Sequence, residues 1–191
     1  MLPLEAVAAR VVRNVAMEAL MEPEKSYEHF PLSMILFAVL VNVSIYALGV
    51  AILSGFGTIT AALYLLYCLG VEIHVMKRSC VDCYYYGKWC AFGKGRAAPL
   101  LFRRGDPKRF ASKCMTWKDL LPDMLVALIP LVGGIALLVR GFSWSVVIML
   151  AALLALSFHG NYIVRTKIAC KYCKQRALGC PAEQFFNKQS A

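Results

Sequence analysis

The sequence predicts an all-α integral membrane protein with four transmembrane helices arranged as two duplicated hairpins. Of its 191 residues, 60% are hydrophobic and 17% are charged, whereas soluble domains are roughly 45–50% apolar and about 25% charged. The 42 residues from Phe30 to Val71 contain no Asp, Glu, Lys or Arg, and one membrane span needs roughly 20 such residues. A cysteine pattern that occurs twice indicates the duplication.

The segment 1–30 precedes the first apolar run and mixes charged with apolar residues. Its apolar residues Leu4, Val7, Val11 and Val15 recur at helical spacing. This spacing predicts an amphipathic helix that lies on the membrane surface or against a partner, or that packs on the protein's own cytoplasmic loop. The segment has no compact apolar core of the kind that a cleavable signal peptide needs.

Two repeat units are expected after this segment. The first, 31–90, has predicted helices at 31–53 and 57–77, separated by a glycine-marked turn. The second, 120–180, has predicted helices at 120–139 and 143–164, with Arg140 and Gly141 between them and Pro122 in its first helical turn. A basic, aromatic loop at 91–119 joins the units, and a tail at 181–191 follows.

The distribution of basic residues predicts the orientation of the helices. Of the 21 Lys and Arg residues, 20 lie before the first helix, between the second and third helices, or after the fourth. The two hairpin turns contain only Arg140. Because short cytoplasmic loops carry an excess of Lys and Arg, both termini and both cysteine segments are expected to be cytoplasmic.

Six of the eight cysteines form two identical C-x2-C-x6-C triplets, each placed after the second helix of a hairpin. Each triplet also has a glycine ten residues upstream, an isoleucine seven upstream and a lysine three upstream: Gly70, Ile73 and Lys77, then Gly160, Ile163 and Lys167. We infer an internal duplication. Because both units enter the membrane from the same face, a pseudo-two-fold axis along the membrane normal would relate them.

Cysteine triplets in a reducing compartment indicate metal binding. Cytosolic thiols rarely form structural disulfides, and thiolates bind zinc, copper(I) and iron–sulfur clusters. The predicted ligands are the six triplet cysteines, and three further residues are candidate extra ligands: Cys80, Cys83, Cys90, Cys170, Cys173 and Cys180, then Cys114, His74 and His159. The predicted cofactor is one or more iron–sulfur clusters, with zinc as the alternative.

The spacing within a triplet limits the geometry of the site. A continuous helix would separate Cys83 from Cys90 by about 10 Å along its axis, so the chain must break between them, and Gly87 and Gly179 are expected to supply the breaks. Three arrangements stay open. Each triplet could hold its own cluster with a fourth ligand, the two C-x2-C pairs could form one four-cysteine site, or all six cysteines could share a larger cluster or two ions.

These features favour a membrane-anchored iron–sulfur electron-transfer subunit. The alternatives are a zinc-stabilised scaffold that recruits partners, soft heavy-metal handling, and thiol–disulfide exchange with a quinone. The sequence shows no nucleophile–histidine–acid set and no flavin or nicotinamide fingerprint, which favours a redox or assembly subunit over a complete enzyme. The loop 91–119 is expected to contact lipid headgroups and to dock a protein partner rather than nucleic acid. Oligomer formation stays open.

Overall fold

The computed structural model describes residues 26–112 and 116–181, which form helices joined by turns and loops. Four helices are long and apolar enough to cross a membrane: Leu32–Phe56, Thr58–Cys80, Trp117–Arg140 and Trp144–Ala169. This confirms the prediction of four helices that are long and apolar enough to span a membrane. Most of the predicted amphipathic helix falls on residues 1–25, which lie outside the described residues, as do Cys114 and residues 182–191 of the predicted tail.

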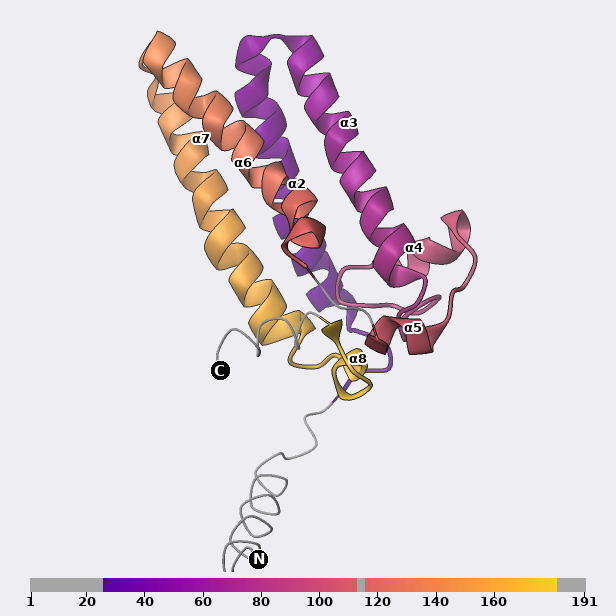
Figure 1. Cartoon of the computed structure of the whole chain (residues 1–191). Helices are drawn as coiled ribbons and strands as arrows, with labels where there is room; N and C mark the ends of the chain where they lie inside the picture. Colours follow the sequence, from indigo (N-terminus) through magenta and orange to yellow (C-terminus); the bar gives the residue numbers. More distant parts are fainter. Residues whose placement is uncertain (1–25, 113–115, 182–191) are drawn as a thin grey trace, which may run out of the picture.

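The regular α-helical parts of the spans are α2 (Leu32–Leu53), α3 (Thr58–Val75), α6 (Trp117–Arg140) and α7 (Trp144–Ala155). The segment predicted as a loop contains two further helices, α4 (Lys94–Leu101) and α5 (Pro107–Ser112), and a short α8 (Lys174–Ala177) follows Cys173. The turns after α2 and after α6 lie at one end of the bundle, and α4, α5 and α8 lie at the opposite end (Figure 1). The two cysteine segments are therefore at the same end.

Four limits of the spans differ by three residues or more from those predicted. The first and second spans end at Phe56 and Cys80, each three residues past its predicted end. Helix α6 begins at Trp117, three residues early, because Thr116 precedes it and donates its N–H to the Asp119 carboxylate at 3.0 Å. Pro122 therefore lies in the second turn rather than the first. The fourth span continues to Ala169, five residues past its predicted end, and within this extension the guanidinium of Arg165 pairs with Asp123 of α6 at 2.9 Å.

Helix α2 occupies the centre of the bundle and packs against α3, α6 and α7. Its buried side includes Ala38, Val41, Ile45 and Ile52, spaced three, four or seven residues apart. The outer surface of the bundle is also apolar; Leu40 and Leu66, for example, are both 64% exposed. Lipid tails cover such a surface at no cost, so this pattern fits a bundle embedded in a bilayer.

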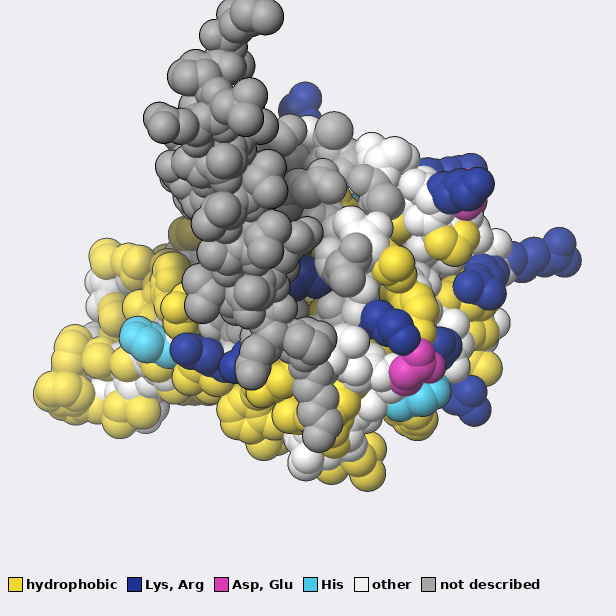
Figure 2. Space-filling view, turned by 90° about the horizontal axis from the view of Figure 1, so that it is seen from below, with side chains coloured by type: hydrophobic (Ala, Val, Ile, Leu, Met, Phe, Trp, Pro, Cys, Tyr) yellow, Lys and Arg dark blue, Asp and Glu magenta, His cyan; other side chains and the backbone are white. Residues whose placement is uncertain are grey.

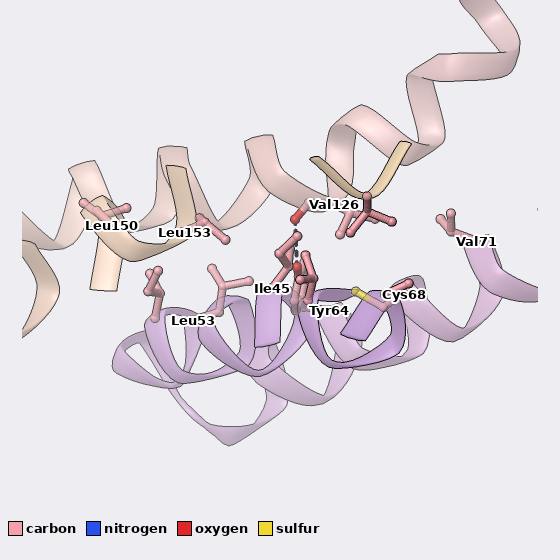
Figure 3. Packing of buried hydrophobic residues seen from close by; sticks show 12 residues of the cluster. Ile45, Leu53, Tyr64, Cys68, Val71, Val126, Leu150 and Leu153 are labelled. Carbon is pink, nitrogen blue, oxygen red and sulfur yellow. Dashed lines mark hydrogen bonds between the residues drawn. The ribbon is translucent and has the colours of Figure 1, made fainter. Parts of the chain in front are cut away.

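A polar contact in the core joins α3 to α6 at a point where one backbone hydrogen bond of α6 is missing. Pro130 has no N–H, so the carbonyl of Val126, four residues earlier, has no helical donor. The hydroxyl of Tyr64 donates to this carbonyl at 2.7 Å (Figure 3). Gly49 of α2 makes room for the ring, because a Cβ there would lie 2.4 Å from the Tyr64 hydroxyl oxygen. This contact fixes α2, α3 and α6 relative to one another.

Candidate metal centre

Each cysteine segment begins where the second helix of a hairpin ends in π-helical turns. Residues Met76–Cys80 form one such turn and Ile163–Ala169 the other. The backbone N–H of Val81 bonds Met76 at 3.3 Å, and that of Cys170 bonds Arg165 at 2.8 Å. Both bonds span five residues, and π-turns of this kind are frequent at functional sites.

The chain breaks between the second and third cysteine of each triplet, as the sequence predicted. No helix runs from Cys83 to Cys90, and in the second triplet the short α8 ends at Ala177. Gly87 has φ 78° and Gly179 has φ 96°, which are left-handed conformations that favour glycine. The breaks allow Cys90 and Cys180 to turn back toward the other cysteines.

Five of the six triplet cysteines lie in one neighbourhood. Burial raises the pKa of the Cys83 thiol to about 12, and the nearby thiols of Cys80, Cys90 and Cys180 contribute to this shift. Burial likewise raises the pKa of Cys173 to about 12, with contributions from Cys83 and Cys180. Cys83, Cys90 and Cys173 also pack in one apolar cluster. Cysteines from both triplets therefore contribute to the environment of Cys83.

A backbone N–H group is directed at one of these sulfur atoms: the N–H of Gly95 lies 3.2 Å from the sulfur of Cys90. The backbone N–H group of Tyr85 lowers the pKa of Cys83, and those of Gln175 and Arg176 lower the pKa of Cys173, against the larger effect of burial, which raises both. Such donors stabilise a thiolate relative to a thiol, and hydrogen bonds to sulfur are one of the features that tune protein-bound clusters.

Gly95 reaches Cys90 only because it has no side chain. A Cβ at this position would lie 2.3 Å from the backbone oxygen of Tyr85 and 2.7 Å from that of Lys88. The carbonyl of Gly95 also accepts a hydrogen bond from the N–H of Gly87 at 2.8 Å. The start of α4 is thereby held tightly over the first cysteine segment.

The two C-x2-C motifs bind each other through a reciprocal pair of hydrogen bonds. The side-chain oxygen of Gln175 accepts from the backbone N–H of Tyr84 at 2.8 Å, and the hydroxyl oxygen of Tyr85 accepts from the N–H of Lys174 at 3.0 Å. Tyr84 and Lys174 each follow the second cysteine of a motif, and Tyr85 and Gln175 each follow one residue later. The same positions therefore exchange the same type of bond in both directions.

A segment just before α2 connects the two motifs. The N–H of Tyr27 bonds the carbonyl of Tyr172 at 3.1 Å, and the carbonyl of Tyr27 accepts from the hydroxyl of Tyr85 at 2.5 Å. The Glu28 carboxylate accepts from the Tyr84 hydroxyl at 2.9 Å and also pairs with Lys174. The hydrogen bonds from Lys174 and then Tyr84 lower the pKa of Glu28 to about 2. We call residues 26–30 the strap.

Other predicted ligands are placed differently. Cys170 is exposed, whereas the other five triplet cysteines are half-buried. His159 is exposed in the π-helical turn Leu156–Gly160, and His74 lines a pocket at the end of α3. Within the described ranges, no three Cys, His, Asp or Glu side chains are close enough together to hold a metal ion. The described cysteines form no disulfide.

Three ion pairs lie at the end of the bundle that holds the first cysteine segment. Lys94 pairs with Glu72 at 2.7 Å, Arg78 with Asp119 at 2.8 Å, and Arg165 with Asp123 at 2.9 Å. The hydroxyl of Tyr46 also donates to Glu72. Figure 2 views this end of the molecule and shows Lys and Arg side chains gathered on it. The pairs connect α4 with α3, the π-helical turn Met76–Cys80 with α6, and the fourth span with α6.

Sequence reasoning identified the cysteines but not the residues that hold them. Tyr85 and Gln175 are buried, at 2% and 5% exposure, and they connect the motifs. Their matched positions after Cys83 and Cys173 were the signal that could have identified them. The strap had no such signal, because nothing in its sequence indicates that it lies between two distant segments.

No protein-family profile, no curated protein and no solved structure matches this chain. A proposal for the function of this protein therefore rests on the residues of the site.

Proposed function

We propose that this protein is a membrane-anchored subunit that holds a cysteine-ligated metal centre, and that the centre is an iron–sulfur cluster used for electron transfer. The observation that carries the proposal is that Cys83 and Cys90 of the first triplet pack in one apolar cluster with Cys173 of the second, and that the N–H of Gly95 lies 3.2 Å from the Cys90 sulfur. Metal binding would displace the thiol protons. The N–H of Gly95 would then stabilise the negative charge on the Cys90 sulfur.

The positions of the cysteines support a centre shared by both triplets. Cys83 is influenced by cysteines of its own triplet and by Cys180 of the other. The exposed position of Cys170 disfavours a single site made only of the two C-x2-C pairs. We propose that Cys80, Cys83, Cys90, Cys173 and Cys180 are the principal ligands, with Cys170 completing the set after a local rearrangement.

The reciprocal hydrogen bonds support an internal duplication. Across a two-fold axis, the same two positions contact each other twice, once in each direction. The pairs formed by Tyr84 with Gln175 and by Tyr85 with Lys174 have this form. We propose that the axis passes between the two C-x2-C motifs, so that the metal centre lies on or beside it.

Thiol–disulfide exchange fits the site poorly. An attacking cysteine needs exposure and a lowered pKa. The Cys83 and Cys173 thiols are instead half-buried, and burial raises the pKa of each to about 12. These thiols would be protonated, and therefore unreactive, near neutral pH.

Structural zinc is the second candidate function. The strap and the reciprocal hydrogen bonds hold the two cysteine segments in one fixed arrangement, which is what a structural zinc site also needs. In that case the cysteine end of the bundle would be a scaffold for partners. Soft heavy-metal handling would instead require weak, exchangeable binding of such ions at the same sulfurs.

The topology gives the electron-transfer proposal its direction. We propose that the cysteine end faces the cytoplasm, because 15 of the 16 Lys and Arg residues that the structure describes lie on the segments at that end. A soluble, acidic redox protein would dock on the basic segment 91–119. The centre would then pass electrons toward a carrier in the membrane.

Metal and labile-sulfide analysis of anaerobically purified protein tests the proposal. We expect iron and sulfide, with broad absorption near roughly 400 nm that bleaches on reduction. Cys83→Ser and Cys173→Ser should each lose most of the bound metal and to a similar extent. Cys68→Ala is the matched control, because Cys68 is buried in the bundle at 1% exposure and is not a proposed ligand.

The outcomes separate the candidate functions. A colourless protein with stoichiometric zinc would exclude the electron relay and support the scaffold. A protein that retains no metal, or in which Cys83→Ser binds as much metal as Cys68→Ala, would contradict a shared cysteine-ligated centre.

A further inference from the structure

Helix α4 exposes large apolar side chains at its C-terminal end. Leu100 is 85% exposed and Leu101 is 58% exposed, and the value for Leu100 is the highest among the large hydrophobic residues that the structure describes. The buried side of the helix consists of Gly95 and Ala98, and by helical periodicity Leu100 lies on the opposite side. The outward side of α4 is therefore apolar where the helix ends.

Helix α4 lies at the level where the spans end. It contacts the turn Met76–Cys80, which ends the second span, and it projects from there away from the bundle (Figure 1). In a bilayer crossed by the four spans, the ends of the spans lie among the lipid headgroups. A helix that projects sideways at this level meets lipid, so the exposed leucines of α4 are next to the apolar part of the membrane.

Two exposed arginines, Arg103 and Arg104, follow these leucines. Within the described part of the chain, neither side chain pairs with a carboxylate. The nearest carboxylate in the sequence, that of Asp106, accepts from the backbone N–H of Lys108 at 2.9 Å and so caps the start of α5. The guanidinium groups are therefore available to an anion from outside the chain, and their planar forks match the oxygens of a phosphate.

Two hydrogen bonds fix the backbone on both sides of the arginines. The hydroxyl of Tyr86 donates to the carbonyl of Phe102 at 2.8 Å, and the N–H of Gly105 donates to the carbonyl of Val81 at 3.0 Å. Phe102 and Gly105 directly flank the two arginines. Because this stretch of chain is already held in place, a ligand that binds the arginines does not have to order it first.

We propose that residues 100–104 form a lipid clamp. Leu100 and Leu101 enter the apolar edge of the leaflet at the cysteine end, and Arg103 and Arg104 bind the phosphates of anionic phospholipids. A soluble anion would satisfy only the arginines, whereas a phospholipid also covers the leucines, so the combination favours a lipid. Each basic residue near an anionic membrane surface strengthens binding by roughly fivefold.

The lipid clamp goes beyond the proposed function and does not depend on a metal centre. It uses only part of the basic segment 91–119. Lys108 and Arg109 are exposed on α5, which lies farther than α4 from the hairpin turns of the bundle (Figure 1). These two residues stay available to the acidic redox protein proposed above.

Lipid selection is measured on the full-length protein in micelles that contain equal amounts of phosphatidylglycerol and phosphatidylcholine. Native mass spectrometry counts the lipids of each class that stay bound. The double variant Arg103→Gln/Arg104→Gln removes the phosphate ligands. The matched control is Lys77→Gln/Lys167→Gln, which removes two exposed basic residues at the same end of the bundle but outside the lipid clamp. We expect the preference of wild type for phosphatidylglycerol to fall about fivefold or more in the clamp variant and less than about twofold in the control.

Insertion of the leucines is measured by tryptophan fluorescence in nanodiscs whose phospholipid tails carry bromine near the headgroup. Leu100→Trp places a reporter on the lipid clamp. Leu178→Trp is the matched control, because Leu178 is also exposed, at 55%, and follows α8 below the bundle (Figure 1). Wild type supplies the signal of the three native tryptophans. We expect bromine to quench most of the fluorescence that Leu100→Trp adds and little of the fluorescence that Leu178→Trp adds.

The outcomes decide between lipid and other partners. Equal quenching of the two reporters, or an equal loss of lipid preference in the clamp variant and the control, would overturn the lipid clamp. If the reporter at position 100 is not quenched and polyglutamate binds through Arg103 and Arg104, the surface docks acidic proteins and the lipid clamp is wrong. The two measurements use different variants, so each tests the lipid clamp if a variant of the other fails to fold. Neither measurement involves bound metal, so a failure of the lipid clamp is distinguishable from a failure of the proposed function.

Discussion

Replacing Tyr64 with Phe tests how the bundle tolerates a proline in the middle of a span. The substitution removes the hydroxyl that donates to the Val126 carbonyl at 2.7 Å. Because Pro130 cannot donate, this buried carbonyl would lose its donor. A buried group left unsatisfied costs about 1–3 kcal/mol, and hydrogen bonds between membrane helices contribute about 0.6 kcal/mol on average and about 1.7 at most. We therefore expect a loss of about 1–2 kcal/mol.

The assay is thermal unfolding in detergent, where such a loss lowers the Tm by roughly 2–8 °C for a chain of this length. Tyr67→Phe is the control. The Tyr67 hydroxyl also donates to a carbonyl of α6, that of Pro122, at 2.8 Å. The residue four positions after Pro122 is Val126, which has an N–H, so the Pro122 carbonyl keeps a helical donor. Tyr67→Phe should therefore cost less than Tyr64→Phe.

A double-mutant cycle tests whether the Tyr64 hydroxyl compensates for the N–H that Pro130 lacks. Pro130→Ala restores an N–H that can donate to the Val126 carbonyl, so Tyr64→Phe should cost about 0.5 kcal/mol or less in that background. The cost of the small cavity left by Pro130→Ala cancels in the cycle. An equal cost of Tyr64→Phe in both backgrounds would show that the hydroxyl does not compensate for the proline.

Two further predictions concern the cysteine end. Tyr85→Phe and Gln175→Leu each remove one member of the reciprocal hydrogen-bond pair. Both variants should therefore lower the Tm and the amount of bound metal to a similar degree. If one variant lowers them and the other does not, the two residues are not equivalent. Because the pKa of Glu28 is lowered from 4.5 to about 2, its contribution to stability is complete above about pH 4.5 and is lost as the pH falls toward 2. The Tm difference between wild type and Glu28→Gln should therefore shrink as the pH falls from 6 to 3. High salt should also reduce this difference at pH 6, because Glu28 is exposed. A Tm difference that does not depend on pH would contradict this account.

The sequence by itself determined the number of spans, because a bilayer imposes a length and an absence of charge that are visible in composition. It also predicted the chain breaks at Gly87 and Gly179, since cysteines seven residues apart cannot meet along a helix. It misplaced the start of α6 and the end of the fourth span. The Thr116–Asp119 contact caps the start of α6, and the Arg165–Asp123 pair, which lies in the extra turns of the fourth span, joins residues 42 positions apart.

Only the tertiary structure decided which residues surround the cysteines. The contacts of Tyr84 with Gln175 and of Tyr85 with Lys174 join segments about 90 residues apart, and no local pattern encodes them. The same holds for the strap and for the pocket, which combines residues of α3 through α6 with residues near the end of the chain. Local propensity and periodicity act within one helix, whereas these sites arise where the ends of different helices are packed together.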